Sequence, residues 1–195
     1  MNILIVYHSK LGSVQKMARL IARGVESVNG CHAVVRTVDD VSNSAEKLSD
    51  NDSGDLVAEL DDLSNCDGLI IGSPTRFGNM SSAMKYFLDS TSSLWMSGAL
   101  SGKPAGVFTS SSSMHGGQES TLLSMMLPLL HHGMLISGIP YSEPALSKTV
   151  TGGTPYGASH VAGSNNSKDI SDDEKALCIA LGKRIATISS ALKNG

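Results

Sequence analysis

The chain has 195 residues, of which 41% are hydrophobic, so we expect a single domain spanning residues 1–195 with a full core. Only 17% of the residues are charged and the formal net charge is −3, which gives no reason to expect nucleic-acid or membrane-surface binding. Three widely spaced cysteines without a CxxC or Cys/His pattern favour buried thiols and no metal site. With no basic leader and no apolar stretch of membrane-spanning length, we expect a cytoplasmic protein that does not insert into a membrane.

Short apolar or β-branched runs predict five strands along the chain. They cover residues 3–6, 33–38, 68–72, 104–109 and 134–137. Helical spacing of apolar residues predicts helices after most of these runs, at residues 14–28, 81–89 and 118–132. A final helix from 171 to about 192 begins with Ser171 and Glu174 in a capping-box pattern.

The remaining segments are polar. Residues 39–62 hold nine acidic side chains against one base, and we expect a loop with at most a short helix there. Residues 138–170 are rich in Gly, Pro, Ser and Thr, and we expect a long loop. Repeated strand-then-helix order predicts a doubly wound α/β protein with a parallel sheet, in which ligands bind beyond the carboxyl ends of the strands.

The turn after the first predicted strand has the components of a phosphate site. It contains Ser9, Lys10, Leu11, Gly12, Ser13 and Val14, and it opens directly into a helix. The two serines offer hydroxyl groups, the glycine allows close approach of a ligand to the backbone, and the helix start offers free N–H groups. An ordinary turn with a serine cap is the alternative.

Two further turns follow the third and fourth predicted strands. The first contains Pro74, Thr75, Arg76, Phe77 and Gly78. The second contains Ser110, Ser111, Ser112, Ser113, Met114, His115 and Gly116. Thr75, the local N–H groups and the small side chains would suit the edge of a planar heterocycle, whereas a flexible serine loop is the alternative for the second turn.

Trp95 and the consecutive histidines His131 and His132 are further candidates. Trp95 is the only tryptophan and falls in a Ser/Gly-rich stretch that we expect to be a loop, where stacking on a ligand is an alternative to a place in the core. His131 and His132 end the predicted helix 118–132. Consecutive histidines point in different directions, so we expect a capping or ligand-facing histidine and no shared metal.

At these residues the sequence resembles the WrbA family, the type IV flavodoxin-like NAD(P)H:quinone oxidoreductases. The matching strings, in chain order, are SPTRFGNM at 73–80, FLD at 87–89 with LW at 94–95, HGGQE at 115–119, HHGM at 131–134 and GGTPYGA at 152–158. They span most of the chain, and together they are specific.

The resemblance implies a five-stranded parallel sheet of order 2-1-3-4-5 with helices on both faces, bound FMN, and a homotetramer built as a dimer of dimers whose sites combine neighbouring subunits. It implies that residues 9–14 hold the FMN phosphate. Residues 75–77 and 110–116 would hold the isoalloxazine, with His131 at its edge, and Pro74 and Gly78 are further cofactor-binding candidates. Trp95 would form a wall of the substrate site, where nicotinamide and quinone bind in turn.

The function implied is FMN-dependent two-electron reduction of quinones by NAD(P)H, with hydride passing through flavin N5 and no catalytic side chain. Two departures from the family pattern concern ligand binding. Leu11, also a substrate-site candidate, stands where relatives often have an aromatic residue implicated in nicotinamide binding, and residues 110–114 lack a glycine that relatives often have. A flavodoxin-type electron carrier and an FMN-binding or assembly protein with weak catalysis are the alternatives.

Overall fold

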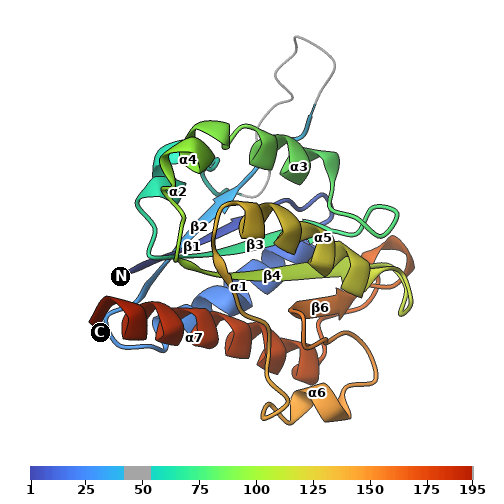
Figure 1. Cartoon of the computed structure of the whole chain (residues 1–195). Coiled ribbons are helices and arrows are strands. Elements are labelled where there is room, and N and C mark those ends of the chain that lie inside the picture. The colour runs from blue at the N-terminus through green and yellow to red at the C-terminus, as the bar shows by residue number, and fades with distance from the viewer. Residues whose placement is uncertain (42–53, 195) are drawn as a thin grey trace.

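The computed structural model describes residues 1–41 and 54–194 and has a parallel sheet between two layers of helices (Figure 1). Its strands are β1 (Asn2–Tyr7), β2 (His32–Thr37), β3 (Gly68–Pro74), β4 (Pro104–Ser111), β5 (Leu135–Ile136) and β6 (Ala158–Val161). They are ordered β2-β1-β3-β4-β5, every pair is parallel, and β6 also pairs with β4. The flavodoxin-like doubly wound sheet and its predicted order are confirmed.

The strands carry apolar residues on both faces because both faces are covered. In β1, Ile3 and Ile5 belong to the core on one side of the sheet, while Leu4 and Val6 belong to the core on the other. Alternate residues of a strand point to opposite faces, so a strand covered on both faces needs an unbroken apolar run.

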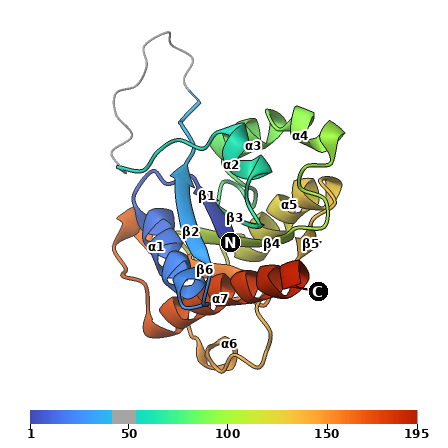
Figure 2. The same ribbon diagram turned by 90° about the vertical axis from the view of Figure 1, so that its left-hand side faces the viewer.

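Helices α1 (Ser13–Glu26) and α7 (Asp172–Asn194) cover one face of the sheet, and α3 (Ser82–Asp89) and α5 (Gln118–His131) cover the other (Figure 2). Shorter helices are α2 (Leu60–Ser64), α4 (Ser92–Ser97), α6 (Ala145–Lys148) and the 3-10 turn η1 (Ser164–Asn166). Helices α1 and α7 pack closely because glycines face the partner backbone: a Cβ on Gly24 would lie 2.1 Å from the Ile179 carbonyl oxygen, and one on Gly182 would lie 2.0 Å from that of Ile21.

The expectation of one long loop over residues 138–170 is wrong, because α6, β6 and η1 lie inside it. Two short strands pair with β4 at the fifth position of the sheet. Strand β5 pairs with the first two residues of β4, and β6 pairs with residues 108–111 of β4. The sequence of β6, Ala-Ser-His-Val, is too short and polar to stand out among glycines and serines. It is nevertheless fully buried, since β4 and α7 cover it.

The expected loop around Trp95 is also wrong, because residues 92–97 form α4. In the acidic segment, α2 begins at Leu60, in line with the expected short helix, while residues 42–53 of that segment lie outside the described residues.

Cys31, Cys66 and Cys178 are buried and free. Burial raises the pKa of the Cys66 thiol to about 11, so it stays protonated near neutral pH. Over residues 1–41 and 54–194, no helix is long and apolar enough to cross a membrane, and no cluster of three or more potential metal ligands occurs.

Candidate functional site

A cleft opens at the carboxyl ends of β1, β3 and β4, where the three predicted turns meet. Its lining consists of Ser9, Lys10, Leu11, Ser13, Val14, Pro74, Thr75, Arg76, Ser110, Ser111, Ser112, Ala162, Gly163, Asn165 and Asn166. The structure therefore brings together most of the predicted cofactor residues. It adds residues 162–166, which belong to the segment 138–170 predicted to be a loop but are not among the predicted cofactor residues.

The start of α1 presents hydrogen-bond donors to the cleft that could bind an anion. Its N-cap is Gly12, which has a φ of 86° and no side chain to bond the first N–H groups of the helix. Ser13 is buried beside them, and the Ser9 hydroxyl is buried without a hydrogen-bond partner among the described residues. An unpaired buried hydroxyl next to an uncapped helix start is a donor set suited to a phosphate.

The turn after β3 is held by hydroxyl groups and by its own backbone. Thr75 Oγ1 lies 3.3 Å from Thr109 Oγ1 and accepts a hydrogen bond from Thr121 Oγ1 at 3.2 Å. The N–H groups of Thr75 and Arg76 donate to the carbonyl oxygens of Ser110 and Asn79. These two amides are thus engaged within the protein, and the expectation that they face a ligand is wrong for them.

Phe77 is the strained residue of this turn. Phe77 and Gly78 both have positive φ, 51° and 73°. A bulky residue rarely adopts this conformation, which is found mainly at functional sites. The Phe77 side chain is fully exposed, so an apolar ring is held out in solvent near the cleft.

The loop after β4 is an ordered turn centred on one carbonyl group. The Ser113 carbonyl oxygen accepts from Ser111 Oγ at 2.7 Å, from Gln118 Nε2 at 3.0 Å and from Gly116 N at 3.2 Å. This bonding excludes the alternative of a structureless serine loop. Met114 and His115 lie on the exposed outer part of the loop and do not line the cleft.

The fourth loop follows β6 and closes on the start of α1. Asn166 Nδ2 donates to the Leu11 carbonyl oxygen at 2.8 Å, and the Ser13 hydroxyl donates to Asn166 Oδ1. In the sequence, the turn-forming residues Gly163, Asn165 and Asn166 were a signal for a loop. Nothing local connected that loop to Ser13, which is 153 residues away.

Trp95 and His131 do not line this cleft. They line a separate groove between α4 and α5, formed by Leu88, Asp89, Thr91, Ser92, Trp95, Pro128, His131 and His132. Helix α5 starts at the carboxyl edge of the sheet and ends at His131 at the opposite edge. Its 14 residues separate the two edges by about 20 Å. Within one chain, His131 and Trp95 therefore lie outside the lining of the cleft.

His132, in the α4–α5 groove, has a defined tautomer. The Thr91 hydroxyl donates to the Leu88 carbonyl oxygen, so it accepts from His132 Nε2 at 2.8 Å. His132 Nδ1 is then the bare nitrogen, and it is buried without a partner among the described residues. Burial, together with the neighbouring His131, lowers the pKa of His132.

Comparison with known proteins places this geometry in a family. Residues 1–142 match the model of the NADPH-dependent FMN reductases. The chain belongs to this family. Two proteins named NAD(P)H dehydrogenase (quinone) are similar over nearly their full length: one from Syntrophobacter fumaroxidans, 45% identical with 98% of each chain covered, and one from Geobacter sulfurreducens, 43% identical with 98% and 99% covered.

Solved structures agree with this family assignment. A flavodoxin, WrbA-like protein from Agrobacterium tumefaciens superposes with a TM-score of 0.67 at 26% identity, covering 97% of this chain and 98% of that one. A flavodoxin from the domain Archaea shares the fold, with a TM-score of 0.65 at 21% identity. The WrbA-like resemblance and FMN as the cofactor of this FMN reductase family member are thus confirmed.

The residues of the cleft fit FMN. The uncapped start of α1 with the free Ser9 hydroxyl suits its phosphate, and the Thr75 hydroxyl and the loop after β4 lie beside it along the same sheet edge.

Proposed function

We propose that the protein is an FMN-dependent NAD(P)H:quinone oxidoreductase, a single flavin-binding domain that works in the cytoplasm. The proposal rests on the start of α1 at the sheet-edge cleft of a member of the FMN reductase family. This helix start has no side-chain cap, and the Ser9 hydroxyl beside it has no partner among the residues that the structure describes. Relatives at 43% and 45% identity over nearly the whole chain are named NAD(P)H dehydrogenase (quinone), which supports the choice of substrates.

Each loop of the cleft would have a distinct task. The first N–H groups of α1 with Ser9 and Ser13 would bind the phosphate, because the helix dipole and hydroxyl donors favour an anion there. Thr75 and the loop of residues 110–116 would orient the ring system. Bound FMN would supply hydride transfer between nicotinamide and quinone.

Apolar side chains at the mouth of the cleft suit planar substrates. The Leu11 and Phe77 side chains are apolar but exposed, with relative solvent exposures of 68% and 107%. They would exclude water from a stacked nicotinamide or quinone ring.

Assembly into a homotetramer would complete the site. Leu123, Leu127 and Leu130 form an exposed apolar row along α5, and Trp95 with Met96 extends it onto α4. An apolar surface of this kind marks an interaction site. Since Trp95 and His131 lie outside the lining of the cleft of their own chain, they would contact the ligand of a neighbouring subunit.

Light scattering tests the assembly, and Trp95→Ala tests the shared site. We expect a tetramer, and a variant that binds FMN normally while its KM for quinone rises. Loss of FMN from the variant would contradict the assignment of Trp95 to the substrate wall.

Steady-state oxidation of NADH and NADPH, with benzoquinone as acceptor and with or without added FMN, tests the reaction. FMN-dependent turnover would support the proposal, and absence of turnover with bound flavin would contradict it. Reductive titration separates the enzyme from a flavodoxin-type carrier, since a carrier would accumulate a stable one-electron-reduced flavin and the enzyme would pass directly to the two-electron-reduced form.

A further inference from the structure

The fourth loop of the cleft contacts the phosphate loop through one side chain. The carboxamide of Asn166 accepts a hydrogen bond from the Ser13 hydroxyl and donates to the Leu11 carbonyl oxygen at 2.8 Å. It thus bonds to a backbone group before the Gly12 turn and to a side chain after it.

The backbone of this loop is held in a conformation that non-glycine residues rarely adopt. Asn165 and Asn166 are consecutive and have φ values of 56° and 57°. Left-handed geometry at a non-glycine residue is unfavourable and tends to persist where the surrounding structure imposes it, often at ligand sites. Asn is, with Asp and Gly, among the residues that tolerate it best.

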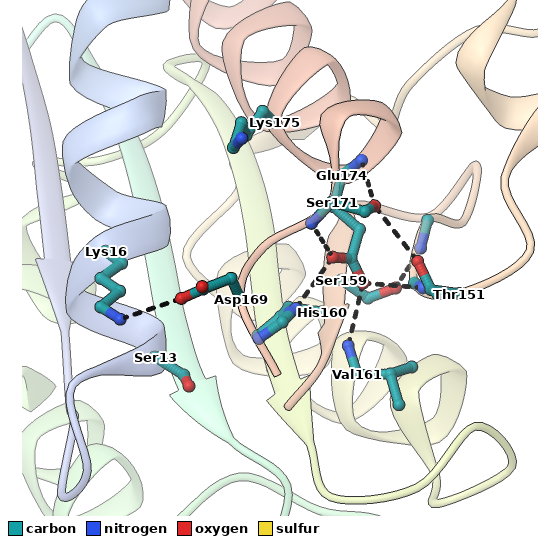
Figure 3. A network of polar contacts seen from close by, with 12 residues as sticks. Ser13, Lys16, Thr151, Ser159, His160, Val161, Asp169, Ser171, Glu174 and Lys175 are labelled. Carbon is teal, nitrogen blue, oxygen red and sulfur yellow. Dashed lines mark hydrogen bonds and ion pairs between the residues drawn. The ribbon is translucent and has the colours of Figure 1, made fainter. Parts of the chain in front are cut away.

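A buried network around Glu174 bonds to β6 just before this loop, and Figure 3 shows it with His160, Ser171 and Val161. Ala162 N donates to the Ser111 carbonyl oxygen at 2.8 Å, which ties the loop to β4. One residue earlier, Val161 N donates to Glu174 Oε1 at 3.0 Å. Glu174 also accepts from Gly152 N, Ser171 N and the His160 ring at 2.7–2.9 Å, and its side chain is 1% exposed. Glu174 therefore positions β6 and the loop that follows it.

The Ser13 hydroxyl can donate only one hydrogen bond, and in this structure the acceptor is Asn166 Oδ1. A phosphate group at the start of α1 is a stronger acceptor for it than a carboxamide, because the acceptor is charged. The Asn166 side chain would therefore lie next to the phosphate and share its donor.

We propose that Asn166 is a specificity-determining residue of the FMN site, which supports binding of the phosphate and has no part in binding the ring. Its bond to Leu11 holds the loop of residues 9–14 in the shape that receives the phosphate. Its carboxamide is neutral, so it does not repel a phosphate group bound beside Ser13. The inference deepens the proposed function and rests on FMN being the ligand of this cleft.

Titration of the full-length apo-protein with FMN and with riboflavin, followed by flavin fluorescence, tests this assignment. Asn166→Asp keeps the size and the tolerance for positive φ but places a negative charge beside the phosphate. We expect FMN affinity to fall about tenfold or more, since like charges at close range are strongly unfavourable, while riboflavin affinity stays within about twofold. Asn166→Gly also keeps the backbone conformation, and we expect a smaller loss, again confined to FMN.

Asn65→Asp is the matched control, because Asn65 is exposed at the end of α2 and does not line the cleft. We expect it to bind both flavins like the wild type, and unfolding midpoints establish that all variants are folded. Equal losses of FMN and riboflavin in the Asn166 variants, or no loss of either, would overturn the proposal. A wild-type protein that binds neither flavin would contradict the proposed function instead.

Discussion

Helices α1 and α7 lie side by side on the same face of the sheet, and both begin at its carboxyl edge, yet their first turns are opposites. Helix α1 has Gly12 as its N-cap, no acidic residue in its first turn and no side-chain cap. Helix α7 starts with three acidic residues, Asp172, Asp173 and Glu174. Ser171 and Glu174 cap it reciprocally, at 3.3 Å and 2.7 Å. A helix start can thus serve two purposes. The capped start of α7 stabilises the fold, whereas the uncapped start of α1 keeps its N–H groups available to a ligand.

The pKa of Glu174 reflects the number of hydrogen bonds that this carboxylate accepts at the start of α7. Burial by itself would raise the pKa of this carboxyl group, but hydrogen bonds from His160, Ser171 and Val161 outweigh burial and lower the pKa to about 2. The carboxylate is therefore charged, buried and fully bonded. Such a group stabilises the folded state only while all its partners are present.

Removal of the Glu174 carboxylate is expected to have the largest effect. Glu174→Ala would leave three backbone N–H groups and His160 without their acceptor, at a cost of about 3–5 kcal/mol in the free energy of unfolding. Urea denaturation measures this. Lys175→Ala, one residue further along α7 and exposed, is the control and should change the free energy by less than about 0.5 kcal/mol. A loss below about 1 kcal/mol in Glu174→Ala would show that the network is not a stabilising unit.

Acid should remove much of the same stabilisation. The folded-state pKa of Glu174 lies below its ordinary value of 4.5, so the contribution is complete above about pH 5 and is lost as the pH falls toward 2. The shift corresponds to about 3 kcal/mol. Unfolding of the wild type and of Glu174→Gln between pH 6 and pH 3 checks the sign: the gap between them should narrow as the pH falls, and a constant gap would contradict the account.

At α1 the expected effect is on the ligand rather than on the fold. Ser9→Ala removes a buried hydroxyl that has no hydrogen-bond partner within residues 1–41 and 54–194, so the apo-protein should be as stable as the wild type. FMN binding should weaken by about 1.5–3 kcal/mol, the usual worth of a hydrogen bond to a charged group. Isothermal titration with FMN measures it. An apo-protein that loses stability with unchanged FMN affinity would reverse the proposed roles.

Ser171→Ala should have the opposite pattern to Ser9→Ala: a small loss of stability with FMN affinity unchanged. Loss of an N-cap serine costs about 1 kcal/mol, so we expect α7 to weaken and the unfolding midpoint to fall. FMN affinity should stay within about twofold, because Ser171 does not line the cleft. A large loss of FMN here would mean that the two helix starts are not independent.

The same contrast explains how far the sequence could predict the structure. The strands of the sheet were visible as apolar runs because each is covered on both faces, and the cap of α7 was visible because Ser171 and Glu174 are only three residues apart. The three turns of the cleft follow directly from their strands, so their meeting at one edge was predictable.

Other features depend on tertiary contacts that a single sequence does not display. Strand β6 has no apolar run and is fixed by pairing with β4, so its sequence does not predict a strand. Helix α4 is short and rich in serine, so its sequence predicts a loop. The link between Asn166 and Ser13 spans 153 residues, and no local pattern records it.

The most direct test of the central claim is a pair of single-turnover reactions with the FMN-loaded protein under anaerobic conditions. Mixing with NADH or NADPH should bleach the absorbance of oxidised FMN, and one equivalent of benzoquinone should then restore it fully. If neither nicotinamide bleaches the bound FMN, or if quinone fails to restore it, the protein is not an NAD(P)H:quinone oxidoreductase.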